Sequence, residues 1–227
     1  MQRHMLRAIV RTLFRIFSHV EVSGLENLPS EGGFLIAINH LSRLDPPLAF
    51  AFLERDDVTA LAADKYKRIP FFRWIVNLVG GIWINREGAD LRALREATNF
   101  LKNGGVLGIA PEGTRSTTGA LIEAKTGVAY LAEKSRVPIV PAAVSGTEDA
   151  VRKLARLKRP HLCLKFGEPF KLPPIGHRPR NEGLVRNTDE IMCRIAVLLP
   201  PRYHGAYADH ACLERFGVEN PSESSEL

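Results

Sequence analysis

Short apolar runs alternate with amphipathic segments from residue 33 to residue 199, and this alternation constrains the fold more than any other feature. Short apolar runs are typical of buried strands, and the longer segments between them repeat at helical spacing. The predicted strands are 33–38, 58–63, 81–85, 106–110, 139–144 and 162–166, and the predicted helices are 45–53, 89–103, 125–135 and 189–199. This order predicts one α/β domain with a mixed, largely parallel central sheet flanked by helices.

An amphipathic helix is predicted before this domain. Arg3, Arg7, Arg11 and Arg15 recur at every fourth position and therefore fall on one helical face. The opposite face is apolar and carries Leu6, Ile9, Val10, Leu13, Phe17 and Val20. Such a helix can lie in a membrane interface, with its arginines on lipid phosphates. It can equally be a first helix that packs on the domain core and leaves its arginines in solvent.

The net charge and the number of cysteines narrow the possible classes of function but do not select one. The net charge of +6 suits nucleic acid, an anionic membrane surface or anionic substrates. The cysteines, Cys163, Cys193 and Cys212, are few, odd in number and far apart, so neither a disulfide framework nor a zinc site is predicted. No metal or cofactor is expected. The sequence has no apolar stretch long enough for a transmembrane helix, and no secretory signal peptide is recognised.

Polar residues follow the predicted strand 33–38 directly. Asn39 and His40 come first, and Asp45 lies five residues after the histidine. Ligands and catalytic groups gather at strand ends in α/β sheets, where a histidine can take a proton from an alcohol and a carboxylate can fix its tautomer. A His-x4-Asp pair occurs often by chance, so its meaning depends on the neighbouring segments.

Two further strand ends carry arginine. The segment 111–116 (PEGTRS) follows the strand 106–110, and Arg86 ends the segment 80–86 (GGIWINR). Glycine permits close backbone approach, and the planar guanidinium of arginine matches the geometry of a phosphate. Each segment alone is equally consistent with a polar turn or a surface arginine. Their succession at three strand ends, one of which carries a histidine base, favours an anion-binding catalytic site.

These segments in this order resemble the glycerolipid acyltransferase family, specifically its lysophosphatidic acid acyltransferase branch. The family's blocks are matched by NHLSRLD at 39–45, GGIWINR at 80–86, EGTRS at 112–116 and VPIVP at 137–141. The resemblance covers residues 20–146. One position departs from it: Asn85 stands where the family often has aspartate, which removes a charge beside the site and leaves the acceptor less defined than the reaction.

The resemblance implies a role for each site residue. His40 is the general base that acts on the acceptor hydroxyl, and Asp45 orients and polarises it. Backbone amides near Gly113 are expected to stabilise the oxyanion. The residues implied to hold or shape the site of the acceptor's phosphate are Arg86, Arg115, Glu112, Gly113, Thr114, Lys65 and Lys125.

The implied reaction is direct transfer of a fatty acyl group from acyl-CoA or acyl carrier protein to the sn-2 hydroxyl of lysophosphatidic acid. Another lysophospholipid or glycerol 3-phosphate is the alternative acceptor. The chain is expected to divide into a membrane-surface helix (1–19), an acyltransferase domain (20–215) and a disordered tail (216–227). The expected location is peripheral, at an anionic membrane surface on the cytoplasmic face.

Other functions find less support in the sequence. A serine hydrolase is expected to carry a G-x-S-x-G elbow, which the sequence lacks. A nucleic-acid binder would explain the charge, but no zinc-finger or RNP-like segment is present, so nucleic acid is not an expected partner. A non-catalytic lipid-binding protein remains open, although such a protein has no need for a histidine paired with a carboxylate.

Overall fold

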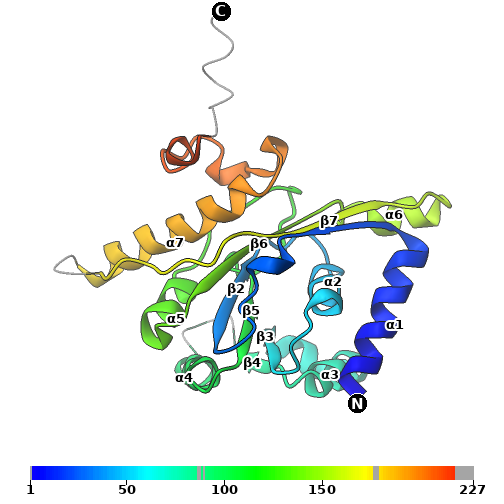
Figure 1. Cartoon of the computed structure of the whole chain (residues 1–227), viewed down its shortest axis with the longest axis horizontal. Helices are drawn as coiled ribbons and strands as arrows, with labels where there is room; N and C mark the ends of the chain where they lie inside the picture. The colour runs from blue at the N-terminus through cyan, green and yellow to red at the C-terminus, as the bar shows by residue number, and fades with distance from the viewer. Residues whose placement is uncertain (1, 86–87, 89, 176–178, 218–227) are drawn as a thin grey trace, which may run out of the picture.

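One seven-stranded sheet organises the chain in the order β1-β7-β6-β2-β5-β3-β4 (Figure 1). The structure, a computed structural model, describes residues 2–85, 88, 90–175 and 179–217. Neighbouring strands are parallel except β6 and β7. The strands are β1 (His19–Ser23), β2 (Phe34–Ile38), β3 (Val58–Ala63), β4 (Ile82–Ile84), β5 (Val106–Ile109), β6 (Ile139–Ser145) and β7 (His161–Phe166). The predicted mixed, largely parallel sheet is therefore confirmed.

Helices cover both faces of this sheet (Figure 1). Helices α1 and α2 lie against one face, and α4, α5 and α7 lie against the other. The helices are α1 (Gln2–Phe17), α2 (Asp45–Phe52), α3 (Pro70–Leu78), α4 (Leu91–Lys102), α5 (Gly127–Ser135), α6 (Ala150–Ala155) and α7 (Arg180–Val197). Short 3-10 turns connect or follow them: η1 (Leu25–Asn27), η2 (Asp64–Arg68), η3 (Pro201–Tyr203), η4 (Gly205–Tyr207) and η5 (Glu214–Phe216).

Strand β2 lies at the centre of the sheet and is buried on both faces. Phe34 and Ile36 point into the core beneath α1 and α2, whereas Leu35 and Ala37 point into the core beneath α4, α5 and α7. Successive side chains of a strand point to opposite faces, so a continuous apolar run is what a central parallel strand requires. The buried strand fixes the position of the polar residues that follow it.

Helix α1 is present as predicted, but its arginine face packs inward, whereas both interpretations of the sequence left the arginines on the outside. The Arg7 side chain is buried and donates to the carbonyl of Glu54 (3.2 Å) and to Asp56 Oδ1 (3.0 Å). Arg11 donates from Nε to the carbonyl of Ala51 (2.9 Å). The last carbonyls of a helix lack intrahelical donors and carry partial negative charge, so the end of α2 and the residues after it attract these guanidinium groups.

The apolar face of α1 consequently points into solvent. Its outermost side chains are about half exposed: Met5, Ile9, Leu13, Ile16 and Phe17. Val10, which was expected on the apolar face, packs against the core instead, as does Phe14 on the arginine side. The helix therefore presents an apolar stripe outward. None of the described helices is both long and apolar enough to cross a bilayer.

Several boundaries differ from the sequence prediction. Helix α7 begins at Arg180 rather than at 189, and the short helices α3 and α6 were not predicted. Helix α4 begins at Leu91, which is exposed, and Ala93, Ala97 and Leu101 face the core. Of the predicted tail 216–227, only residues 216 and 217 fall within the described part of the chain.

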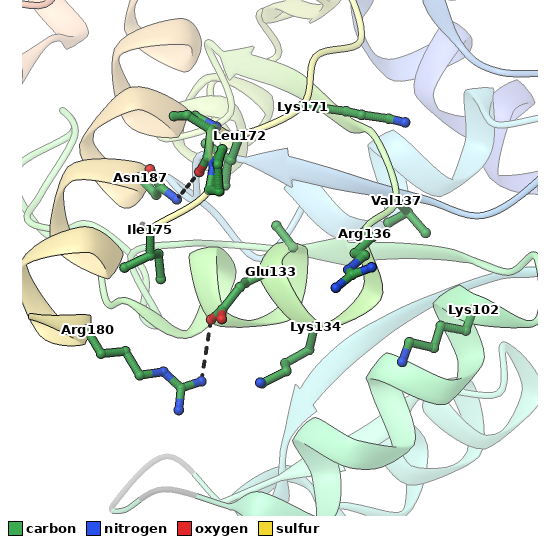
Figure 2. A pocket seen from close by; sticks show the side chains of 13 residues that line it. Lys102, Glu133, Lys134, Arg136, Val137, Lys171, Leu172, Ile175, Arg180 and Asn187 are labelled. Carbon is green, nitrogen blue, oxygen red and sulfur yellow. Dashed lines mark hydrogen bonds and ion pairs between the residues drawn. The ribbon is translucent and has the colours of Figure 1, made fainter. Parts of the chain in front are cut away.

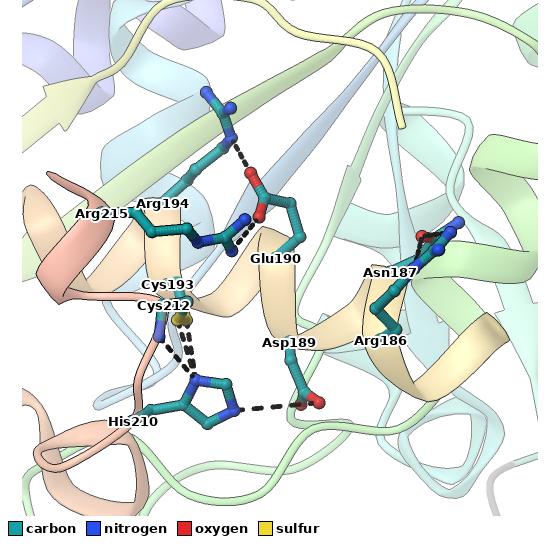
Figure 3. A network of polar contacts seen from close by, with 9 residues as sticks. All are labelled: Arg186, Asn187, Asp189, Glu190, Cys193, Arg194, His210, Cys212 and Arg215. Atoms are coloured by element: carbon teal, nitrogen blue, oxygen red, sulfur yellow. Dashed lines mark hydrogen bonds and ion pairs between the residues drawn. A yellow bond between two sulfur atoms is a disulfide. The ribbon is translucent and has the colours of Figure 1, made fainter. Parts of the chain in front are cut away.

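The expectation that the cysteines form no disulfide is wrong. The structure joins Cys193 on α7 to Cys212 in the C-terminal segment as a disulfide, although 19 positions separate them in the sequence. Residues after α7 turn back along the helix, so two cysteines that are far apart in the chain meet in space (Figure 3). Cys163 on β7 is a free cysteine.

Candidate active site

His40 is held at the carboxyl end of β2 by the residue before it. The Asn39 side chain is fully buried and pairs with the backbone of Val144 on β6. Its amide nitrogen donates to the Val144 carbonyl (2.9 Å), and its oxygen accepts from the Val144 N–H (2.7 Å). These two bonds continue the pairing of β2 with β6 by one step. The next residue, His40, is thereby fixed at the edge where the parallel strands end.

The structure brings His40 and Asp45 together as predicted. His40 Nδ1 lies 2.9 Å from Asp45 Oδ2, and the same oxygen accepts from the backbone N–H groups of Leu41 (2.7 Å) and Ser42 (2.6 Å). Since a carboxylate oxygen accepts, Nδ1 is the donor and Nε2 keeps its lone pair. Asp45 is buried, whereas the His40 side chain is 17% exposed and can be reached by a substrate.

Thr147 is a site residue that the sequence prediction missed. Its hydroxyl donates to Asp45 Oδ1 at 2.5 Å, so both carboxylate oxygens are held. Thr147 comes two residues after the end of β6, at the same sheet edge as His40. The intervening Gly146 has a φ of 82°, and an added Cβ would clash with the carbonyl of His161. The only signal in the sequence that could have identified Thr147 was its position just after the end of a strand.

Glu112 supports the backbone of the site. Its carboxylate is almost completely buried and accepts from the N–H of His40 (2.8 Å) through Oε1 and from the N–H of Ile122 (3.2 Å) through Oε2. The N–H of Ser116 donates to the His40 carbonyl at 2.8 Å. The loop that follows β5 thus forms hydrogen bonds with both the backbone N–H and the backbone carbonyl of His40. These contacts give Glu112 the position of a group that orders the histidine.

Burial gives this carboxyl an unusual proton affinity. Desolvation raises the pKa of Glu112 from 4.5 to about 7, with a smaller contribution in the same direction from Asp45, against the opposing effect of the two backbone hydrogen bonds. The folded state therefore holds the proton at pH values where the unfolded chain releases it. The stabilisation from this preference is complete below pH 4.5 and is lost as the pH rises to about 7.

This linkage predicts how Glu112→Gln changes stability. The glutamine stays neutral, so its stability lacks the glutamate's pH dependence. Between pH 5 and pH 8, we expect the free energy of unfolding of the unmodified protein to fall by about 2–3 kcal/mol relative to that of the variant. Urea denaturation of both proteins at the two pH values measures this difference. Identical pH dependence in the two proteins would show that Glu112 titrates normally.

The remaining predicted residues gather around the same loop and the same sheet edge. Gly113 adopts a φ of 70°, and a Cβ added there would lie 3.1 Å from Lys125 Cδ, so this glycine and Lys125 are in contact. The Gly113 N–H donates to the carbonyl of Ala110 (3.0 Å), which removes it from the expected oxyanion donors. Thr114 and Arg115 are exposed at the end of the turn.

Lys65 reaches the site's edge from another strand. It lies in η2 directly after β3, is exposed, and places Nζ 5.5 Å from the centre of the Tyr66 ring. Because β2, β5 and β3 are adjacent and parallel, Lys65, Arg115 and His40 leave the sheet at one edge. Arg86 lies outside the described residues; β4, the strand that precedes it, ends at Ile84.

A large basic pocket lies at the other edge of the sheet. It measures about 1120 Å³, and its lining includes Lys102, Lys134, Arg136, Lys171 and Arg180 (Figure 2). Val137, which also lines it, precedes β6, and Lys102 precedes β5, so the pocket opens at the amino ends of strands whose carboxyl ends carry the site. This pocket is therefore separate from the His40 site.

Comparison with known proteins places this arrangement in a family. A profile of the Acyltransferase family matches residues 19–145, which include β1 to β6 and the site described above. The chain belongs to the acyltransferase family. The family match ends at β6, so the C-terminal third, including β7 and α7, lies beyond it. The site residues His40, Asp45 and Glu112 all fall inside the match.

Individual acyltransferases resemble between 64% and 83% of the chain. A crystal structure from Thermotoga maritima, titled as the 1-acyl-sn-glycerophosphate (LPA) acyltransferase PlsC, superposes with a TM-score of 0.65 at 30% identity, over 83% of this chain and 76% of that one. The 1-acyl-sn-glycerol-3-phosphate acyltransferase of Bacillus subtilis is 24% identical over 83% of this chain and 92% of its own. The 1-acyl-sn-glycerol-3-phosphate acyltransferase of Borreliella burgdorferi is 30% identical over 64% of this chain and 59% of its own.

Proposed function

We propose that this acyltransferase moves a fatty acyl group from an acyl thioester to the sn-2 hydroxyl of lysophosphatidic acid and forms phosphatidic acid. The observation that carries the proposal is the His40–Asp45 pair, whose Nδ1–Oδ2 contact of 2.9 Å leaves Nε2 as a base at an accessible sheet edge. The names of the relatives from T. maritima, B. subtilis and B. burgdorferi support the choice of lysophosphatidic acid. The donor is acyl-CoA or acyl carrier protein.

The proposed step begins with the acceptor's proton. Nε2 of His40 takes it as the hydroxyl oxygen attacks the thioester carbonyl, and the new C–O bond creates a tetrahedral oxyanion. Asp45, held by three hydrogen bonds besides that of His40, stabilises the imidazolium that forms. Collapse of the intermediate breaks the C–S bond, and the thiolate receives the proton from His40. No covalent acyl-enzyme is required.

The cationic side chains of the same edge provide the acceptor's phosphate site in this proposal. Arg115 follows the turn that is bonded to His40, Lys125 contacts Gly113, and Lys65 lies at the end of β3. Arg86 is proposed as a fourth cation from its place in the sequence. A phosphate held by these groups would orient the sn-2 hydroxyl toward His40, and such positioning lowers the entropic cost of the reaction.

Product analysis tests this proposal. Purified protein in detergent micelles receives a long-chain acyl-CoA with lysophosphatidic acid, another lysophospholipid or glycerol 3-phosphate, and products are identified by mass spectrometry. The proposal predicts phosphatidic acid as the main product, at a rate above that with either other acceptor. A preference for glycerol 3-phosphate or for a different lysophospholipid would reassign the acceptor. Thioester hydrolysis without transfer to any acceptor would overturn the proposal.

We also propose that α1 docks this enzyme on the cytoplasmic face of an anionic membrane. The stripe formed by Met5, Ile9, Leu13, Ile16 and Phe17 is exposed to solvent, and contiguous apolar surface of this kind favours a lipid interface. Helix α3 lies beside the amino-terminal end of α1 (Figure 1) and exposes Trp74. The exposed cations near it, Lys65, Lys67, Arg68 and Arg73, suit anionic headgroups.

A single substitution on the stripe should weaken membrane binding. Ile9 is 50% exposed at the centre of the stripe, and Ile9→Glu removes its burial in the acyl region and adds a charge there. We expect the partition coefficient into anionic vesicles to fall about 10–100-fold, measured by co-sedimentation. Ala8→Glu is the matched control, because Ala8 is exposed on the same helix away from the stripe. Equal binding by both variants would contradict docking through α1.

A further inference from the structure

A second cluster of reactive side chains lies away from the active site. Cys193 on α7 meets His210 and Cys212 of the C-terminal segment (Figure 3), and one ligand atom from each residue lies within 4.8 Å of the others. Cys193 is fully buried and Cys212 nearly so, whereas the His210 side chain is 37% exposed. Two sulfurs and an imidazole nitrogen therefore converge at the edge of the core.

Hydrogen bonds define which nitrogen of His210 faces the sulfurs. Nδ1 lies 2.9 Å from Cys212 Sγ and 3.6 Å from Cys193 Sγ, and it accepts the backbone N–H of Cys212 at 3.3 Å. An accepting Nδ1 carries no proton, so the proton belongs to Nε2, which lies 3.9 Å from Asp189 Oδ2. Nδ1 is thus the ring nitrogen that lies near both sulfur atoms, and it carries no proton.

Reduction changes what these three residues can do. A disulfide ties both sulfurs into one covalent bond, whereas two free cysteines can lose their protons and offer two thiolates beside Nδ1. A cation at the centre of the three atoms would then receive an electron pair from each of them. Thiolate and imidazole together are the ligand set of zinc sites, and carboxylate-rich sets suit magnesium or calcium instead.

We propose that, in the reduced chain, Cys193, Cys212 and His210 bind one zinc ion. Binding forms two Zn–S bonds and one Zn–N bond and releases the two thiol protons to solvent, and the two thiolates neutralise the charge of the ion. Asp189, one turn before Cys193 on α7, has Oδ2 3.9 Å from Nε2, and a shift of its side chain would let it accept from Nε2–H and orient the imidazole, as outer-shell carboxylates around zinc do. A water molecule would complete a tetrahedral site.

The surroundings allow an ion to reach the cluster. A cleft of about 800 Å³ is lined by His210, Cys212 and Asp189 together with residues of α7 and the segment before it. Arg194 and Arg215 beside it are both paired with Glu190, at 2.8 Å and 2.7 Å (Figure 3). Glu190 therefore offsets one of the two positive charges and holds both guanidinium groups in place.

The proposed ion would fix the C-terminal segment that forms hydrogen bonds with the loop after β5. The ring centre of Tyr207 lies 5.8 Å from that of His210, and its hydroxyl accepts the N–H of Ala124 at 3.2 Å. Leu121 donates to the carbonyl of Tyr203 (2.8 Å) and accepts from the N–H of Ala206 (3.0 Å). The loop held in this way also contains Ile122, whose N–H binds Glu112. Zinc would thus have a structural role, linked to the site through this loop.

Metal analysis of the full-length protein tests the proposal. The protein is purified with a non-thiol phosphine reductant, and bound zinc is measured by inductively coupled plasma mass spectrometry. We expect about one zinc per chain, and with Co²⁺ in its place a thiolate-to-cobalt charge-transfer absorption. Cys212→Ser should abolish both signals, and Asp189→Asn should lower zinc affinity about 10–100-fold while leaving the ligands intact.

Cys163→Ser is the matched control, because Cys163 lies on β7 beside Glu21 and outside the cluster. It should retain zinc and the cobalt absorption. The proposal is overturned if the reduced protein binds no zinc and gives no cobalt absorption, or if Cys212→Ser binds as much metal as the unmodified chain. It is also overturned if intact mass shows that the Cys193–Cys212 disulfide persists in the reductant, since the cluster would then be a structural crosslink only.

Discussion

Replacing His40 with alanine is expected to lower kcat/KM for acyl transfer by about 10²–10⁴-fold, the usual contribution of a general base. The acceptor hydroxyl is a poor nucleophile while it keeps its proton, and Nε2 of His40 is the base that the pairing with Asp45 leaves accessible. The loss should fall on kcat, because the cations assigned to the phosphate are unchanged. Initial rates at saturating acyl-CoA and varied lysophosphatidic acid measure it.

A matched control separates this effect from a general disturbance. His161 on β7 is exposed and stacks on His19, with ring centres 4.8 Å apart, outside the site. His161→Ala should therefore keep its activity, and His40→Ala should keep binding to anionic vesicles. Retention of more than a tenth of the activity by His40→Ala would mean that another group takes the proton.

Asp45→Asn is expected to lower kcat by about 10²–10³-fold without moving His40. The asparagine oxygen can still accept from Nδ1 and from the N–H groups of Leu41 and Ser42, and its amide can donate to the Thr147 hydroxyl. What is lost is the negative charge beside the developing imidazolium. A charge pair about 4 Å apart at an effective dielectric constant of about 20 is worth about 4 kcal/mol.

The measurement compares kcat and KM of Asp45→Asn with those of Asp45→Ala and Asp56→Asn. Asp45→Ala removes the hydrogen bonds as well and should lose more activity. Asp56 is exposed just before β3, at the opposite edge of the sheet from His40, and serves as the control. A fall of less than tenfold in Asp45→Asn would show that the carboxylate only orients the histidine.

The sequence allowed the fold and the centre of the site to be predicted because both depend on local pattern. Apolar runs marked β2, β3, β5 and β6, and parallel strands end at one edge, so the polar residues after them meet there. His40 and Asp45 needed only five residues and one turn to come together. Asn39 and Thr147 could not be assigned their roles, because these depend on the register between β2 and β6.

Other features depend on contacts that periodicity does not reveal. The helical period of α1 showed that its faces differ, but the unpaired carbonyls near the end of α2 decided that the arginines pack inward. The spacing of Cys193 and Cys212 gave no sign of their contact, because the direction of the chain after α7 brings them together. Glu112 was expected near the substrate, and its burial beneath the His40 backbone reflects the fold of the whole loop.

The central claim is direct transfer to the acceptor with His40 as base. The measurement that tests it most directly follows free thiol from acyl-CoA with and without lysophosphatidic acid, together with the intact mass of the quenched protein, in the unmodified enzyme and in His40→Ala. The account predicts thiol release only with acceptor, one ester formed per thiol, unacylated protein, and near-complete loss in the variant. A burst of thiol release without acceptor that leaves the protein acylated would contradict it.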